Sequence, residues 1–271
     1  MFMQSMLFVP GSKPDRFAKA LASGADCVCI DLEDAVPAEA KSAARGVAIE
    51  AAATDPRFAI RINGLTTREG VADLLAIAAA PVRPPLLFIP KVDAAHEIVI
   101  AREVLADGAV GFVPLIETVK GLAAAPAIAK EAQVAMLMFG GGDFSTELGV
   151  ELAWEPLLVA RSQLIMAAAG AGIPAMDVPF IRLDDEGGLR EEAEKARVLG
   201  FSAKSAIHPA QIEVIHAVFR PSAAAIAEAY EARAAFAAAG GAAVRFKGKM
   251  LEAPFMRRYE QIIAIGEKIN A

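Results

Sequence analysis

The feature that most constrains the fold is a repeat of short apolar runs, each followed by an alanine-rich helical stretch. Eight runs recur along the chain: Met6–Pro10, Cys27–Leu32, Phe58–Ile62, Leu86–Val92, Gly111–Ile116, Val134–Phe139, Ile173–Val178 and Ser202–Ile207. The stretches between them place apolar residues at i, i+3, i+4 and i+7, which is typical of amphipathic helices. The runs themselves alternate little, which indicates parallel strands buried on both faces.

Eight consecutive strand-then-helix units predict an α/β protein with a (β/α)8 TIM barrel. A doubly wound sheet is the alternative, but no G-x-G-x-x-G follows the first run. We expect the barrel to occupy residues 1–220. Residues 221–271 predict a C-terminal extension or lid segment, with a helix near Ser222–Ala239, a short hairpin and a last helix from about Pro254.

Composition limits the functional classes. The net charge of −6 argues against a general nucleic-acid binder, which needs a basic face. No apolar run approaches the roughly 18 residues of a membrane span, and the first ten residues do not have the pattern of a signal peptide. Cys27 and Cys29 are two residues apart on one expected strand, so they are interpreted as buried thiols. Free thiols fit a reducing compartment, and we expect a cytoplasmic protein.

Ionisable side chains follow nearly every expected strand. They are Asp31, Glu33, Asp34, Arg61, Lys91, Glu117, Asp143, Asp177, Lys204 and His208. Because the carboxyl ends of barrel strands carry the active site in this architecture, we expect these groups to lie on one rim.

Glu117 and Asp143 end adjacent strands, which lie about 4.8 Å apart in a parallel sheet. Two carboxylates there can share a divalent cation, and oxygen ligands with retained waters suit Mg²⁺. The alternative is that each acid caps a helix. Gly140, Gly141 and Gly142 precede Asp143, and their bare amides can hold the carboxylate of a keto acid; the alternative is a flexible turn.

Arg61 is expected on the same rim, where it can grip a carboxylate or polarise a carbonyl. The alternative is a structural pair with Asp31 or Glu33. The run Asp31, Glu33 and Asp34 can orient metal-bound waters and Arg61, or it is a solvated acidic face.

A first turn, VPGSKPDRF, combines Lys13 and Arg16 with the start of a helix. Helix N-termini with nearby cations bind phosphates. An ordinary capped turn is the alternative.

Nine segments resemble, in order, the citrate lyase β-subunit-like family, within the wider group of HpcH/HpaI aldolases and malyl-CoA lyases. They include LFVPGSKPDRFAKAL, ADCVCIDLEDAVPAEAKSAAR, IRINGL, LFIPKV, PLIETVKGL, FGGGDFSTELG, ARSQLIMAAAGAGIPAMD, GFSAKSAIHPAQI and FKGKMLEAP. The resemblance implies a barrel that assembles as a trimer or a pair of trimers. It also implies Mg²⁺ on Glu117 and Asp143, Arg61 at the reacting carbonyl, and CoA phosphates near Lys13 and Arg16.

The implied reaction is reversible carbon–carbon cleavage of a 3-hydroxyacyl-CoA of the citramalyl, malyl or citryl type, giving a keto acid and an acyl-CoA. Two alternatives remain: an aldolase acting on free hydroxy-keto acids, and a keto-acid-binding barrel with weak or no catalysis.

Two positions depart from the family pattern. Glu252 stands where members that cleave or condense malyl-type thioesters resemble GKM-x-D-x-P, with an acid/base Asp that a neighbouring subunit supplies. The resemblance implies either that Glu252 takes over this catalytic role or that the site is reshaped for another substrate. Gly142 stands where many members have an acid. The longer side chain of Glu252 would shift its carboxylate by about an ångström, enough to cost on the order of 100-fold in rate.

Overall fold

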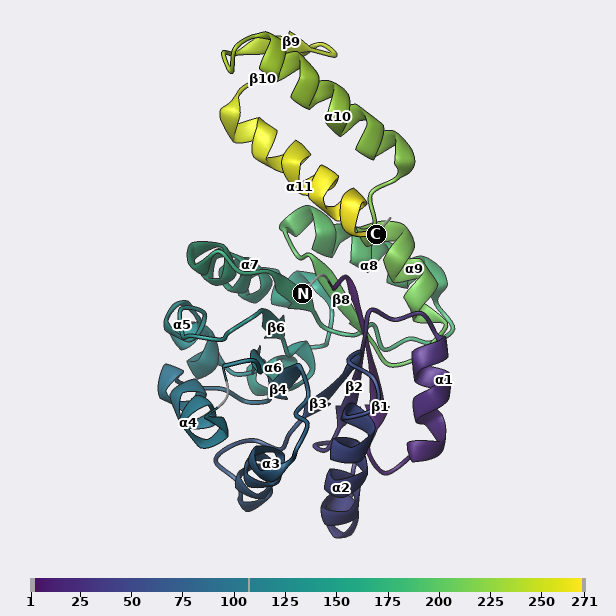
Figure 1. The fold of residues 1–271 in the computed structure, drawn as a ribbon, viewed down its shortest axis with the longest axis vertical. Helices are drawn as coiled ribbons and strands as arrows, with labels where there is room; N and C mark the ends of the chain where they lie inside the picture. Colours follow the sequence, from purple (N-terminus) through teal and green to yellow (C-terminus); the bar gives the residue numbers. More distant parts are fainter. Residues whose placement is uncertain (1–2, 107, 270–271) are drawn as a thin grey trace. The chain divides into compact units, whose positions relative to one another are not determined.

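A closed parallel barrel forms the larger part of the protein, as a computed structural model of residues 3–106 and 108–269 shows (Figure 1). Each strand pairs with the next in the chain, and the last pairs with the first. The strands are β1 (Ser5–Pro10), β2 (Cys27–Asp31), β3 (Phe58–Arg61), β4 (Leu86–Ile89), β5 (Gly111–Ile116), β6 (Leu137–Phe139), β7 (Ala175–Asp177) and β8 (Ala203–Ala206). The predicted TIM barrel is confirmed.

Helices follow the strands and surround the barrel (Figure 1). They are η1 (Pro14–Arg16), α1 (Phe17–Ala22), η2 (Ala38–Ala40), α2 (Lys41–Ala52), α3 (Arg68–Ala79), α4 (Ala95–Leu105), α5 (Val119–Ile128), α6 (Gly141–Leu148), α7 (Trp154–Ala171), α8 (Glu186–Leu199) and α9 (Gln211–Phe219). A helix at α6 was considered only as the alternative in which Asp143 caps it, and its start at Gly141 was not predicted, because consecutive glycines disfavour a helix. Asp143 in its first turn and the left-handed Gly149 at its end are the favourable signals that the glycines obscure.

The interior of the barrel is an apolar core rich in methionine and cysteine, and it includes Cys27, Cys29, Ala59 and Leu115. Alternate residues of a strand point to the same face. The inward positions therefore continue from Cys29 to Asp31, from Ala59 to Arg61 and from Leu115 to Glu117, and the last residue of each pair lines a cavity at the carboxyl end of the barrel.

The remaining residues form a second compact unit, and the contacts divide the chain between His216 and Ala217, inside α9. This unit contains α10 (Ala223–Ala238), β9 (Val244–Phe246), β10 (Lys249–Leu251) and α11 (Ala253–Ile269). Lys247 and Gly248 join the two strands, both at positive φ as a two-residue hairpin turn requires. The helices and hairpin expected from sequence are confirmed; the boundary after residue 220 and the lid role stay predictions.

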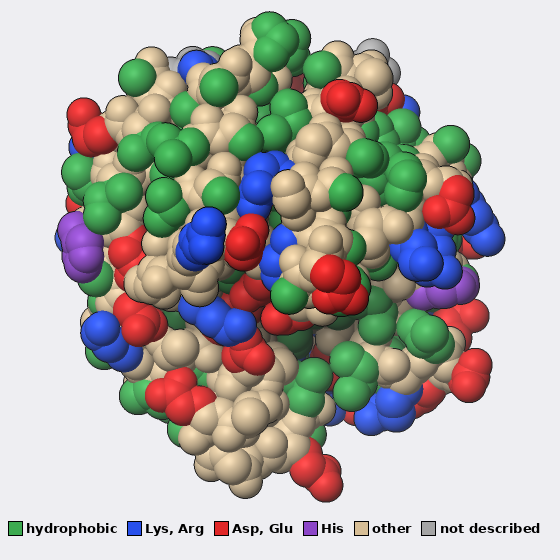
Figure 2. Space-filling view, turned by 90° about the horizontal axis from the view of Figure 1, so that it is seen from below, with side chains coloured by type: hydrophobic (Ala, Val, Ile, Leu, Met, Phe, Trp, Pro, Cys, Tyr) green, Lys and Arg blue, Asp and Glu red, His purple; other side chains and the backbone are tan. Residues whose placement is uncertain are grey.

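The surface has no large area of one charge in the view of Figure 2, where acidic and basic side chains are interspersed. Within residues 3–106 and 108–269, no helix has the length and hydrophobicity needed to cross a membrane.

Candidate active site

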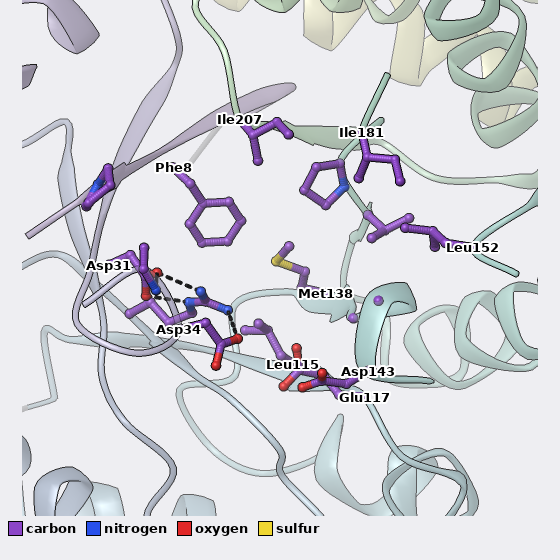
Figure 3. A pocket seen from close by; sticks show the side chains of 17 residues that line it. Phe8, Asp31, Asp34, Leu115, Glu117, Met138, Asp143, Leu152, Ile181 and Ile207 are labelled. Carbon is purple, nitrogen blue, oxygen red and sulfur yellow. Dashed lines mark hydrogen bonds and ion pairs between the residues drawn. The ribbon is translucent and has the colours of Figure 1, made fainter. Parts of the chain in front are cut away.

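A cavity of about 520 Å³ lies at the carboxyl ends of the barrel strands. Its walls come from most of the strand-to-helix connections (Figure 3). The lining residues are Phe8, Pro10, Asp31, Asp34, Ala35, Arg61, Leu115, Glu117, Met138, Gly140, Gly142, Asp143, Leu152, Val178, Pro179, Ile181 and Ile207. The structure thus brings the expected arginine and both expected metal ligands to one cavity.

Arg61 is held in place by Asp31. Its Nε and one terminal nitrogen each donate to a different oxygen of Asp31, both at 2.7 Å, as the dashed lines of Figure 3 show. The guanidinium also lies 4.8 Å from the centre of the Phe8 ring. Burial lowers the pKa of Arg61, but the hydrogen bond and charge of Asp31 outweigh it and raise that pKa above the ordinary range. The arginine is therefore a fixed, permanent cation.

Further carboxylates surround this pair. Glu33 is buried, and its Oε2 lies 3.0 Å from Arg61. Its other oxygen accepts from the Lys91 ammonium at 2.9 Å. Asp34 is more exposed and lies 3.9 Å from Arg61. The backbone of Asp31 to Ala35 is folded around the Asp31 carboxylate, which accepts the amides of Glu33 and Ala35. The acidic run is thus not a solvated face: it holds the two cations of the rim.

Glu117 is the buried acid of the cavity, with 6% of its surface exposed. Burial raises its pKa to about 8, and the charge of Glu33 adds to that shift while Arg61 opposes it. One carboxylate oxygen accepts the backbone amide of Lys91 at 2.9 Å. Lys91 has φ of 53°, a left-handed conformation that is uncommon for a residue with a side chain. Its backbone thus turns to orient Glu117.

The three glycines have different roles. A Cβ on Gly140 would overlap the Glu117 side chain, so this position must be bare for the acid to fit. The amide of Gly140 already donates to the carbonyl of Ile116. Gly141 and Gly142 begin α6, where first-turn amides have no partner within the helix. The amides suited to a carboxylate are therefore those of Gly141 and Gly142.

Asp143 lies beside Glu117 in the cavity (Figure 3), and its carboxylate is 3.2 Å from the Lys91 ammonium. Within the described residues, no group of three or more His, Cys, Asp or Glu side chains is arranged to hold a metal ion. Two carboxylates with open space beside them suit a cation that keeps several waters, which is the preference of Mg²⁺. The thiols of Cys27 and Cys29 are buried in the barrel core, so the site offers oxygen donors. The donor set fits magnesium.

Three other expected site residues lie elsewhere. Lys13 and Arg16 have exposed side chains in the turn after β1 and do not line the cavity. Glu252 belongs to the second unit, between β10 and α11, where its carbonyl accepts the amides of Phe255 and Met256. The roles that the resemblance implies for Lys13, Arg16 and Glu252 stay predictions.

Asp177 and Lys204 do not join the rim, which corrects the expectation that all the strand-end charges share it. Both side chains are fully buried, and neither lines the cavity. The residues beside them, Met176 and Ala203, point into the barrel, so Asp177 and Lys204 point outward by the alternation of the strand. Exposed His208 is also absent from the lining. Conversely, Lys91 contacts both Glu33 and Asp143, a role that its position after β4 alone did not reveal.

Comparison with curated proteins gives relatives over the whole chain. The chain is 36% identical to a citrate lyase subunit beta-like protein of Deinococcus radiodurans, covering 97% of this chain and 96% of the relative. It is 34% identical to a (3S)-malyl-CoA thioesterase of Cereibacter sphaeroides (99% and 96%). It is 33% identical to an L-malyl-CoA/beta-methylmalyl-CoA lyase of Cereibacter sphaeroides (98% and 95%).

Among solved structures, the protein CitE from Mycobacterium tuberculosis in complex with magnesium, acetoacetate and coenzyme A matches with a TM-score of 0.83 at 31% identity, covering 98% of each chain. The family model for HpcH/HpaI aldolase/citrate lyase matches residues 4–209, which include the barrel strands and every residue that lines the cavity. The chain is therefore a member of the HpcH/HpaI aldolase/citrate lyase family.

Proposed function

We propose that this protein is a Mg²⁺-dependent carbon–carbon lyase, or the reverse synthase, acting on a 3-hydroxyacyl-CoA thioester of the citramalyl, malyl or citryl type. The products are a keto acid and an acyl-CoA. The observation that carries this function is the joint placement of Glu117, Asp143 and Arg61 in one cavity of a barrel that belongs to this family. Two carboxylates for a cation and a fixed guanidinium are what such a cleavage needs.

Glu117 and Asp143 would hold the magnesium ion. When bound, it supplies electrophilic stabilisation of the oxygen on the carbon that becomes the ketone. Arg61 directs two of its five N–H groups at Asp31, and its other terminal nitrogen lies 3.0 Å from Glu33. The N–H groups that remain can donate to an oxygen in the cavity. Because Asp31 fixes the guanidinium before substrate arrives, little reorganisation is needed as charge develops on that oxygen.

The reaction needs one base and one acid. The 3-hydroxyl loses its proton and becomes the carbonyl of the keto acid as the C2–C3 bond breaks. The electron pair of that bond passes to the thioester as an enolate, which takes up a proton to give the acyl-CoA. We assign the acid/base role to Glu252 of a neighbouring subunit, which requires an oligomer, and we propose that this oligomer is a homotrimer or hexamer. Lys13 and Arg16 are proposed to contact CoA phosphates, and the free thiols fit a cytoplasmic location.

A condensation panel tests the function. The purified protein is mixed with Mg²⁺, acetyl-CoA or propionyl-CoA, and glyoxylate, pyruvate or oxaloacetate in turn, and new thioesters are detected by mass spectrometry. We expect an EDTA-sensitive adduct from at least one pair. The same synthetic adduct, supplied as substrate, should return the keto acid and the acyl-CoA.

Other products would assign a different function. Release of free CoA with an intact hydroxy acid would indicate thioester hydrolysis, and condensation of free keto acids without CoA would indicate the aldolase. Mg²⁺-dependent binding of keto acids with no product from any pair would leave a binding barrel.

A further inference from the structure

The cavity has two chemically distinct ends (Figure 3). At one end lie the acids and Arg61. At the other lie hydrocarbon and thioether side chains, which we call the apolar end: Met138, Leu152, Val178, Ile181 and Ile207. They come from β6, the α6–α7 connection and the segments after β7 and β8, so the apolar end is built by several elements of the barrel and not by one loop.

The apolar end has no side chain that could pair with a carboxylate. Arg61 is the one cationic residue among those that line the cavity, all of which lie within the described ranges. It lies against Asp31 and Glu33 at the acidic end. Lys91 is likewise engaged with Glu33 and Asp143. A carboxylate placed at the apolar end would face hydrocarbon on one side and the negative charges of the rim on the other.

We infer that the keto acid released by this enzyme carries an alkyl group, and not a hydrogen atom or a carboxymethyl group, on its carbonyl carbon. The inference rests on the proposed function and narrows its substrate to the class of 3-hydroxy-3-alkyl thioesters. With the carbonyl and carboxylate of the keto acid at the acidic end, its remaining substituent extends toward Met138, Leu152 and Ile207.

The expected preferences follow from burial. Each methylene that enters an apolar site contributes about 0.8 kcal/mol, which is about fourfold in affinity. An unpaired carboxylate in the same place loses hydration without a compensating partner. We therefore expect pyruvate and 2-oxobutyrate to bind more tightly than glyoxylate, by about fourfold for each added carbon. We expect both to bind more tightly than oxaloacetate, by on the order of 100-fold.

Two measurements test this preference on the full-length protein. One is kcat/KM for condensation of acetyl-CoA with glyoxylate, pyruvate, 2-oxobutyrate or oxaloacetate. The other is the Kd of each free keto acid with Mg²⁺ by calorimetry, which needs no turnover. The expected order in both is 2-oxobutyrate, pyruvate, glyoxylate and then oxaloacetate.

Variants at the cavity mouth locate the preference. Ile181 and Ile207 are 57% and 43% exposed, so a longer polar side chain at either position need not disturb the core. Ile181→Arg or Ile207→Arg supplies a cation at the apolar end. Either change should raise the ratio of kcat/KM for oxaloacetate to kcat/KM for pyruvate at least tenfold. Val198→Arg is the matched control, because Val198 is 77% exposed on α8 and does not line the cavity.

The outcomes separate the two proposals. A lyase that prefers oxaloacetate or glyoxylate overturns the alkyl inference and leaves the proposed function standing. No adduct from any pair, with the keto acids still bound in the expected order, overturns the proposed function, and with it the inference about a released product, and leaves only the alkyl preference of the cavity. A keto-acid order that all three arginine variants shift equally would show that the apolar end does not set the preference.

Discussion

Two charged networks follow the strands of this barrel, and they differ in which side of the strand they occupy. The rim network consists of Asp31, Glu33, Arg61, Lys91 and Asp143. Three of its members line the cavity: Asp31, Arg61 and Asp143. The sealed network consists of Arg161, Asp177, Glu192 and Lys204, and it lies outside the barrel wall. One residue of register separates the two directions.

The sealed network is closed by its own charges. Asp177 accepts from Arg161 at 2.9 Å and from Lys204 at 2.7 Å. Lys204 also donates to Glu192 and to the carbonyl of Val178, so all three of its hydrogens are used. Burial raises the pKa of Asp177, but the two cations outweigh it and lower that pKa. Asp177 and Lys204, the centre of this network, are therefore satisfied by partners within the protein.

The rim network is incomplete by comparison. The side chains of Lys91 and Asp143 are each 44% exposed to the cavity and solvent. Glu117, next to them, is buried with a pKa raised to about 8 and the backbone amide of Lys91 as a partner. A buried acid that its surroundings do not fully compensate is a place for an added cation. The comparison indicates that chemistry belongs to the rim and rigidity to the sealed network.

The largest expected effect is the loss of activity in Glu117→Gln and Asp143→Asn. Each change keeps the size of the side chain but removes a charge that Mg²⁺ needs, so we expect kcat/KM to fall more than a thousandfold. The assay is EDTA-sensitive thioester formation. Glu147→Gln, on the same helix as Asp143 and exposed, is the control and should retain activity. Activity near the control level in either variant would remove the two-carboxylate site.

The next effect tests the sealed network. Lys204→Met leaves Asp177 and Glu192 with a single buried cation, and removal of one partner from a buried pair typically destabilises by about 3 kcal/mol or more. Urea denaturation measures the free energy of unfolding. Lys195→Met breaks an exposed pair with Glu191 and should change it by less than about 0.5 kcal/mol.

The molecules of Lys204→Met that remain folded should keep the wild-type kcat, since the sealed network does not reach the cavity. A loss of kcat comparable to that of Glu117→Gln would contradict the division between the two networks.

The sequence predicted the barrel because eight apolar runs of the right spacing leave few other arrangements. It also predicted Arg61, Glu117 and Asp143 correctly as cavity residues. It did not predict that Asp31 faces the cavity while Asp177 faces away from it. Both acids end an apolar run, and a run without alternating polarity does not indicate which side of the strand a residue is on. Alternate positions counted from a residue known to face the barrel interior distinguish the two acids.

The role of Lys91 could not be predicted for a different reason. A left-handed φ directs the backbone amide of Lys91 at Glu117. The sequence FIPKV does not indicate this conformation, because lysine is not favoured there. The different roles of the three glycines could not be predicted either. Only the position of the Glu117 side chain explains why Gly140 must lack a Cβ.

A smaller effect separates the ammonium of Lys91 from its backbone. Lys91→Asn tolerates the left-handed conformation and keeps the amide that Glu117 accepts, but it removes a cation 3.2 Å from Asp143. With less positive charge in the rim network, we expect Mg²⁺ to bind about tenfold more tightly. Calorimetric titration with Mg²⁺ measures this. Lys120→Asn, an exposed lysine paired with Asp93, should leave the affinity unchanged, and weaker binding in Lys91→Asn would show that the ammonium does not compete with the metal.

The smallest expected effect is the pH dependence of the metal-free protein. Burial raises the pKa of Glu117 from 4.5 to about 8, so the folded protein holds a proton that the unfolded chain has lost between these values. The stability that this proton contributes is complete below pH 4.5 and is lost as the pH rises through 8.

Mg²⁺ must displace the proton on Glu117, so the affinity for Mg²⁺ should rise about five- to tenfold from pH 7 to pH 8.5. Calorimetry in buffers of different ionisation enthalpy counts the protons released. At pH 7 we expect the release of close to one proton per Mg²⁺ bound. Glu117→Gln should abolish this release, and Glu147→Gln should keep it. No proton release from the wild-type protein would mean that Glu117 is already ionised, and that the rim network compensates its charge as fully as the sealed network compensates that of Asp177.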